Sequence, residues 1–223
     1  DAEAASEDTA VDADSTTDRT ETADTAEADA PSASDTTEAI DDTDATEADT
    51  TATDATSATA VDQFFRALMD EKWQPIARVV PPYFADPAYI EALAQSVERA
   101  YAAKEDKPDI LVCSYHGMPQ RYLTEGDPYH CECQKTTRLL KERLGWDDTQ
   151  ITTTFQSVFG PEEWLRPYTV GEVARLAEED GKKKIAVIAP AFSADCIETL
   201  EEINEEIKES FEEAGGEDFT YIP

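Results

Sequence analysis

The sequence predicts an α/β fold in which helices flank a parallel β-sheet. From about residue 55 to residue 223, short apolar or β-branched segments alternate with amphipathic segments of ten or more residues. This alternation is typical of successive βαβ units, whose strands run parallel to one another. The segment 184–189 is apolar after its first residue, as expected of a strand buried on both faces of such a sheet.

The predicted strands are runs of apolar and β-branched residues bounded by turn-forming residues. They lie at residues 76–80, 109–115, 151–155, 184–189 and 219–222. Pro81 and Pro82 stop the first strand, because proline cannot donate a hydrogen bond to a sheet. The last strand breaks off at Pro223, so we expect the domain to be truncated at its end.

The predicted helices follow from apolar residues at helical spacing and from residues that favour helix ends. They run from about 54 to 73, from 87 to about 104, from about 132 to 144, from about 170 to 179 and from about 195 to 213. Asp86 suits the N-cap of the second helix, and Pro87 suits its first turn. Gly145 ends the third helix, and a polar, proline-bearing loop is expected over 116–130.

Residues 1–54 differ in composition and are predicted to be a disordered, acidic, low-complexity tail. Residues 1–60 hold 19 of the 51 acidic residues of the chain and one basic residue, Arg19. Val11 and Ile40 are their only apolar side chains larger than alanine, so burial cannot offset the entropy lost on ordering. A tail of this charge repels nucleic acid, and we expect no nucleic-acid partner.

The first residues contain neither a basic start nor an apolar stretch, which predicts a cytoplasmic protein. No apolar run in the sequence approaches the length of a membrane span. Four cysteines in 223 residues do not suggest a disulfide scaffold, so we expect reduced thiols.

The segment Ser114–Pro119 places a histidine, His116, directly after the predicted strand 109–115. In open α/β sheets, ligands bind beyond the carboxyl ends of the strands. The chain has one other histidine, His130, so a chemistry that needs an imidazole has few places to occur. His116 is therefore the candidate base or metal ligand, and the alternative is a structural histidine at a strand end.

A second segment of interest, 190–200, follows the predicted strand 184–189 and contains Glu198. Glu198 is expected in the first turn of the next helix, at the same edge of the sheet as His116. Glu202 and Glu206 follow at i+4 and i+8 and share one helix face, where a cation or a flow of protons would relieve the repulsion between like charges. The alternative for Glu202 and Glu206 is a solvated acidic face.

Four segments, taken together and in this order, closely resemble motifs of the ferrochelatase family. They are Ser114–Pro119, Glu125–Tyr129, Phe155–Leu165 and Ser193–Leu200. The resemblance runs from about residue 55 to residue 223 and implies the second of two Rossmann-like halves that face each other across a porphyrin cleft. It also implies that the N-terminal half is missing from this chain and that the acidic tail stands in its place.

The resemblance implies a lyase that inserts ferrous iron into protoporphyrin IX to form protohaem in haem biosynthesis. It implies catalytic and metal-binding roles for His116 and Glu198, with Glu202 and Glu206 as a secondary path for metal or protons. Trp164 and Tyr129 would contact the porphyrin, Fe²⁺ would be the substrate metal, and the parent enzyme would associate peripherally with membranes. The oligomeric state is not predicted.

Three other functions fit the sequence. Two are related enzymes, a coproporphyrin ferrochelatase and a cobalt or nickel tetrapyrrole chelatase, and the third is a non-catalytic acidic module that holds metal or haem. Some family members bind a [2Fe–2S] cluster, which normally takes four cysteines. Only Cys131 and Cys133 are close together in this sequence, so we expect no cluster.

Overall fold

The structure, a computed structural model, describes residues 54–223 and contains a four-stranded sheet with the order β2-β1-β3-β4. The strands are β1 (Ile110–His116), β2 (Ile151–Gln156), β3 (Lys184–Ile188) and β4 (Asp218–Ile222), and all adjacent pairs are parallel. The parallel α/β fold predicted from the sequence is confirmed. The predicted acidic tail lies outside the described residues.

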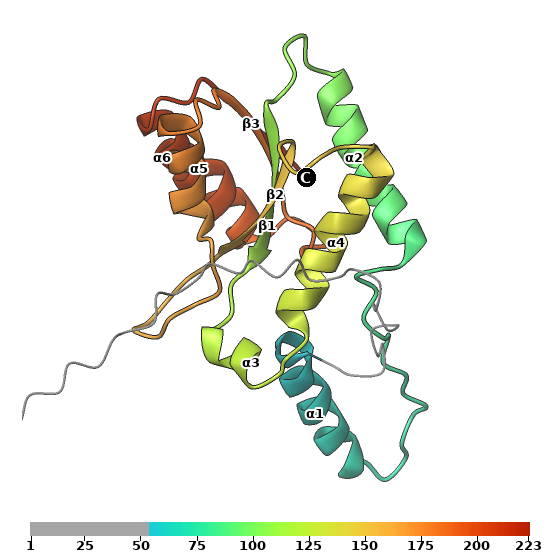
Figure 1. Cartoon of the computed structure of the whole chain (residues 1–223). Helices are drawn as coiled ribbons and strands as arrows, with labels where there is room; N and C mark the ends of the chain where they lie inside the picture. Colours follow the sequence, from blue (N-terminus) through green and yellow to red (C-terminus); the bar gives the residue numbers. More distant parts are fainter. Residues whose placement is uncertain (1–53) are drawn as a thin grey trace, which may run out of the picture. The chain divides into compact units, whose positions relative to one another are not determined.

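Helices cover both faces of the sheet (Figure 1). One face carries α2 (Pro87–Ala102) and α4 (Tyr129–Leu144), and the other carries α5 (Thr169–Glu178), a π-helix η1 (Glu198–Ile207) and α6 (Lys208–Glu213). Asp86 caps α2 by accepting hydrogen bonds from the backbone N–H groups of Ala88 and Tyr89, as its position before Pro87 predicts. Gly145 ends α4 in the left-handed conformation, with a φ of 67°.

The central strand β1 sends alternate side chains into two separate apolar cores. Leu111, Cys113 and Tyr115 pack in the core under α2 and α4, whereas Ile110 and Val112 pack in the core under α5, η1 and α6. This is the two-residue period of a strand buried on both faces. It follows that Ser114 and His116, which continue the even-numbered positions, belong to the face covered by η1.

Two sequence predictions of secondary structure are wrong in detail. The loop predicted over 116–130 contains a short helix, α3 (Gln120–Thr124), and the chain re-enters helix at Tyr129. The helix predicted over 195–213 begins with the ten π-helical residues of η1 before it becomes α-helical in α6. A 3.6-residue pattern cannot reveal this change, because a π-helix differs in its i→i+5 hydrogen bonds and not in the residue types that it buries.

The predicted strand 76–80 is also wrong, because its residues pair with no strand within the described part of the chain. Ile76 is 92 % exposed and Val80 is 75 % exposed. The helix before it, α1 (Ala55–Met69), has no buried residue, although Asp54 caps it and Phe64 and Phe65 are on its surface. Residues 76–80 therefore have the composition of a strand but lack a neighbouring strand with which to pair.

No helix among residues 54–223 is both long and apolar enough to cross a membrane.

We predict that Leu140→Ala in α4 lowers the free energy of unfolding by about 2–5 kcal/mol, because the side chain is fully buried and its loss leaves a cavity. Urea unfolding measures this change. The matched control is Leu200→Ala, which removes the same atoms from a side chain that is 48 % exposed and should change the unfolding free energy much less. Equal losses for the two variants would contradict the assigned core.

Candidate functional site

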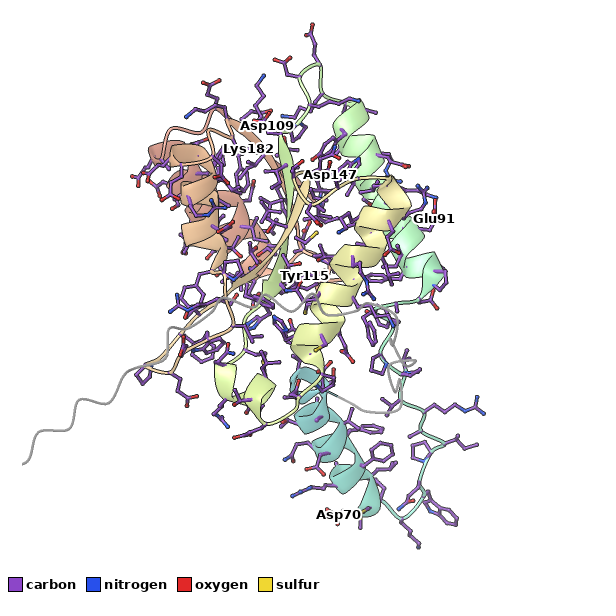
Figure 2. All side chains as sticks on the ribbon, in the orientation of Figure 1. Asp70, Glu91, Asp109, Tyr115, Asp147 and Lys182 are labelled. Atoms are coloured by element: carbon purple, nitrogen blue, oxygen red, sulfur yellow. The ribbon has the colours of Figure 1, made fainter. Side chains whose placement is uncertain are left out.

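The carboxyl ends of β1 and β2 coincide, and this brings the predicted site to one edge of the sheet. His116 is paired in register with Gln156, and both are the last residues of their strands. Figure 2 labels Tyr115 at this end of β1 and Asp109 at the opposite end. The site therefore lies at the sheet edge where α/β proteins bind ligands.

The imidazole of His116 is half-buried, and a backbone contact fixes its tautomer. Its Nδ1 lies 2.7 Å from the carbonyl oxygen of Gly117, which can only accept a hydrogen bond. In the neutral ring Nδ1 therefore carries the proton, and Nε2 is left with a free lone pair. That nitrogen is the atom that can accept a proton or bind a metal ion.

Gly117 follows His116 at a point where other parts of the chain lie close to the backbone. Its N–H donates to the carbonyl oxygen of Gln156 at 2.7 Å, and a Cβ on this residue would lie 2.7 Å from that oxygen and 3.0 Å from Cε3 of Trp164. Both separations are too short for a side chain at this position. The histidine is thus followed by glycine because β2 and Trp164 approach the backbone closely.

Glu198 is the first residue of η1, and its carboxyl group interacts electrostatically with His116. The thiol of Cys196, the backbone N–H of Glu198 and the charge of His116, in that order, hold the pKa of the Glu198 carboxyl below its usual range. Its carbonyl oxygen accepts a hydrogen bond from Nε2 of Gln156 at 2.8 Å. The backbone of Glu198 is thus hydrogen-bonded to Gln156, which is the register partner of His116 on the neighbouring strand.

Gln156 is a site residue that sequence reasoning missed. It is 2 % exposed, and its side chain also donates to the carboxylate of Glu202. A glutamine at the end of a predicted strand, next to a strand that ends in histidine, was the signal available in the sequence.

The three glutamates of the predicted acidic path are not equivalent in the structure. Glu202 and Glu206 both line a cavity of about 220 Å³ between the end of β2, the start of α5 and η1. Glu202 accepts hydrogen bonds there from Gln156 and Ser157, while Glu206 is exposed. Glu198 does not line this cavity, and its carboxyl group interacts electrostatically with His116 instead.

Trp164, a predicted porphyrin contact, is 4 % exposed and belongs to a loop tied to the end of β1. The N–H of Leu165 donates to the carbonyl oxygen of Met118 at 2.9 Å, and Phe159 packs against the indole with ring centroids 4.7 Å apart. The indole Nε1 is buried and has no hydrogen-bond partner among residues 54–223. Phe159, which is 69 % exposed, is therefore the aromatic ring that this loop presents to solvent.

Tyr129, the other predicted porphyrin contact, lies behind His116. Its hydroxyl donates to the carbonyl oxygen of His116 at 2.8 Å, and burial raises the pKa of the phenol well above its usual value. The ring lines a cavity of about 210 Å³ together with Tyr115, Glu132 and Pro190. Tyr129 thus supports the end of β1 from the face that carries α4.

The four cysteines are free thiols in separate surroundings. Cys113 is buried in β1, Cys131 and Cys133 lie in α4, and Cys196 precedes η1. Burial raises the pKa of Cys113 to about 12. Among residues 54–223, no group of three or more His, Cys, Asp or Glu side chains is placed to hold a metal ion.

Comparison with known proteins agrees with this geometry. The family model of ferrochelatase matches residues 30–223, and the chain belongs to the ferrochelatase family. A ferrochelatase of Rhodobacter capsulatus is 74 % identical over 169 residues, which cover 76 % of this chain and 48 % of that protein. Ferrochelatases of Rhizobium meliloti and Rhizobium etli are 54 % and 56 % identical over 169 residues, covering 76 % of this chain and 50 % and 49 % of those proteins.

The chain spans about half the length of the curated relatives that it matches.

The pKa of Glu132 predicts how stability depends on pH. Desolvation, followed by the charges of Asp54 and Asp127 and a hydrogen bond to Asp54, raises this pKa from 4.5 to about 7. Folding therefore favours the protonated acid, and its favourable contribution is complete below about pH 4.5 and is lost as the pH rises to about 7. We expect Glu132→Gln, which stays neutral, to reduce the fall in the urea midpoint between about pH 5 and about pH 8.

The control for this prediction is Glu142→Gln, which changes an exposed glutamate on the same helix. Its urea midpoint should vary with pH as that of the wild type does. If Glu132→Gln and the wild type showed the same pH dependence, the carboxyl of Glu132 would not be protonated in the folded chain near neutral pH.

Proposed function

We propose that this chain supplies one wall of a ferrochelatase site, at which Fe²⁺ is inserted into protoporphyrin IX to form protohaem. The observation that carries the proposal is that Gln156, the register partner of His116 at the carboxyl edge of the sheet, is hydrogen-bonded to the backbone of Glu198. Membership of the ferrochelatase family and the printed name of the relatives support it.

The chemistry of metal insertion matches these two groups. A porphyrin exchanges two pyrrole N–H protons for one divalent cation, so its site needs proton acceptors near the ring. Nε2 of His116 has the free lone pair that accepts a proton, and imidazole is also a ligand for Fe²⁺. The carboxylate of Glu198 is held in its ionised form, which adds a second acceptor and a hard oxygen ligand.

A metal ion that is a substrate has to pass from the protein to the porphyrin. A closed set of three or four protein ligands would retain the ion. With two protein groups, the remaining ligands come from the pyrrole nitrogens as the ion is transferred. We propose that the exposed Phe159 faces the apolar ring of the porphyrin from the loop after β2, and that the buried Trp164, which packs against Phe159, supports it.

We also propose that the isolated chain turns over slowly or not at all, because about half of the relatives' length has no counterpart in it. We further propose that the enzyme is a lyase and that it is located in the cytoplasm. The full-length enzyme would associate peripherally with membranes.

Exchanging the matched segment tests the function. The 169 residues that match the Rhodobacter capsulatus ferrochelatase replace the corresponding part of that protein, and insertion of Fe²⁺ or Zn²⁺ into protoporphyrin IX is followed by absorbance. The hybrid should be active, and His116→Ala or Glu198→Ala should lower its kcat about 100-fold or more, as expected for loss of a proton acceptor.

His130→Gln and Glu205→Gln are the matched controls. The first changes the other histidine, and the second changes an exposed glutamate of η1. Both variants should retain activity. A preference for coproporphyrin III, for Co²⁺ or for Ni²⁺ would replace this proposal by one of the related chelatases, and haem binding without metal insertion would replace it by a non-catalytic module.

A further inference from the structure

Gln156 occupies an unusual position for an uncharged polar side chain. It ends β2 beside His116, is almost completely buried and faces the first turns of η1. A buried amide that lacks hydrogen-bond partners destabilises a protein, so each of its polar atoms needs one. The hydrogen bonds of this amide therefore show which parts of the chain it connects.

All polar atoms of the Gln156 side chain are engaged. The oxygen Oε1 accepts from the hydroxyl of Ser114 at 2.6 Å. The nitrogen Nε2 donates to the backbone carbonyl of Glu198 at 2.8 Å and to Oε2 of Glu202 at 3.1 Å. One amide thus connects β1, β2 and two residues of η1 that are four positions apart.

The orientation of the amide is determined by its neighbours. Rotating it by half a turn would direct Oε1 at a carbonyl oxygen and a carboxylate, which can only accept hydrogen bonds. Ser114 itself lies 2.8 Å from the hydroxyl of Thr169, and the hydroxyls of Thr169 and Thr154 are 2.9 Å apart. Because Ser114 gives its proton to Gln156, Thr169 is the donor to Ser114. These buried hydroxyl groups fix Ser114, and Ser114 fixes the amide.

Glu202 is held from a second direction by Ser157. The backbone N–H of Ser157 donates to Oε1 of Glu202 at 2.5 Å, and its hydroxyl donates to Oε2 at 2.5 Å. Ser157 has a φ of 59°, a left-handed conformation that is uncommon for a residue with a side chain. Both carboxylate oxygens of Glu202 are therefore occupied by donors from β2 and the residue after it.

We infer that Gln156 is a positioning residue that clamps the start of η1 to the end of β2 and so sets where Glu198 lies relative to His116. The inference rests on the proposed function, because the position of Glu198 matters through the metal-insertion site. It also gives Glu202 a specific role. Its carboxylate accepts the hydrogen bonds that hold η1 to the end of β2, so it is not free to bind a metal ion.

The clamp needs an amide and not an acid. A carboxylate at position 156 would accept from Ser114, but it would face the carbonyl of Glu198 and the carboxylate of Glu202 without a proton to donate. Methionine has a similar size and shape and provides neither a donor nor a strong acceptor. Gln156→Met therefore removes the clamp while filling nearly the same space.

Hydrogen exchange tests the clamp without any need for enzyme activity. In the full chain, Gln156→Met should speed amide exchange in the peptides covering Glu198–Ile207 by about tenfold or more, because hydrogen bonds to a charged group are lost. Gln95→Met is the matched control, since Gln95 donates to Glu91 on the exposed surface of α2. It should leave exchange in η1 unchanged.

A spectroscopic signature separates positioning from general loosening. The chain has two histidines, so the Cε1–H protons of its imidazoles give two NMR resonances. In Gln156→Met the signal of His116 should shift, because Glu198 moves, while that of His130 should remain in place. In the metal-insertion hybrid the same change should lower kcat with little effect on the KM for porphyrin.

A charge-swapped pair keeps the test independent of folding defects. Gln156→Glu combined with Glu202→Gln restores a donor and an acceptor between these two positions, and it should recover much of the protection that Gln156→Glu alone loses. Unchanged exchange in η1 with an unmoved His116 signal would overturn the inference, and so would strictly additive effects in the pair. An inactive hybrid would refute the proposed function instead and leave the exchange result standing.

Discussion

The parallel pairing of β1 with β2 is the constraint on which the candidate site depends. Their register ends both strands together, so His116 and Gln156 are neighbours at the carboxyl edge of the sheet. A slip of one residue would turn Ser114 and His116 towards α2 and α4, away from η1. The fixed register is maintained by the two apolar cores, which bury alternate side chains of β1 on opposite faces.

The face of the sheet under η1 changes character along β1. Ile110 and Val112 are in an apolar core, but the next even positions carry Ser114 and His116. The buried Ser114 is tolerated because its hydroxyl donates to Gln156 and lies 2.8 Å from the hydroxyl of Thr169. The half-buried imidazole of His116 is bonded through Nδ1 to the carbonyl oxygen of Gly117. Along this face of β1, two apolar core residues are thus followed by the hydrogen-bonded Ser114 and then by the imidazole of His116.

Much of this arrangement is predictable from local sequence, and the rest depends on long-range contacts. The four strands of the sheet and the edge that carries His116 and Glu198 follow from residue patterns. The strand predicted at 76–80 fails because a strand requires a partner, and the described residues provide none for it. The role of Gln156 escaped prediction because it depends on hydrogen bonds between segments more than 40 residues apart. The π-helical form of η1 escaped prediction because it does not change the residue types that the helix buries.

The exposed apolar residues between Phe64 and Tyr83 have a consequence for the chain in solution. Exposed apolar side chains favour association, whereas the net charge of −33 keeps molecules apart by repulsion. Added salt shortens the range of that repulsion to about 10 Å at 0.1 M and leaves apolar attraction in place. The ionic strength of the buffer therefore sets the balance between dispersed and associated molecules.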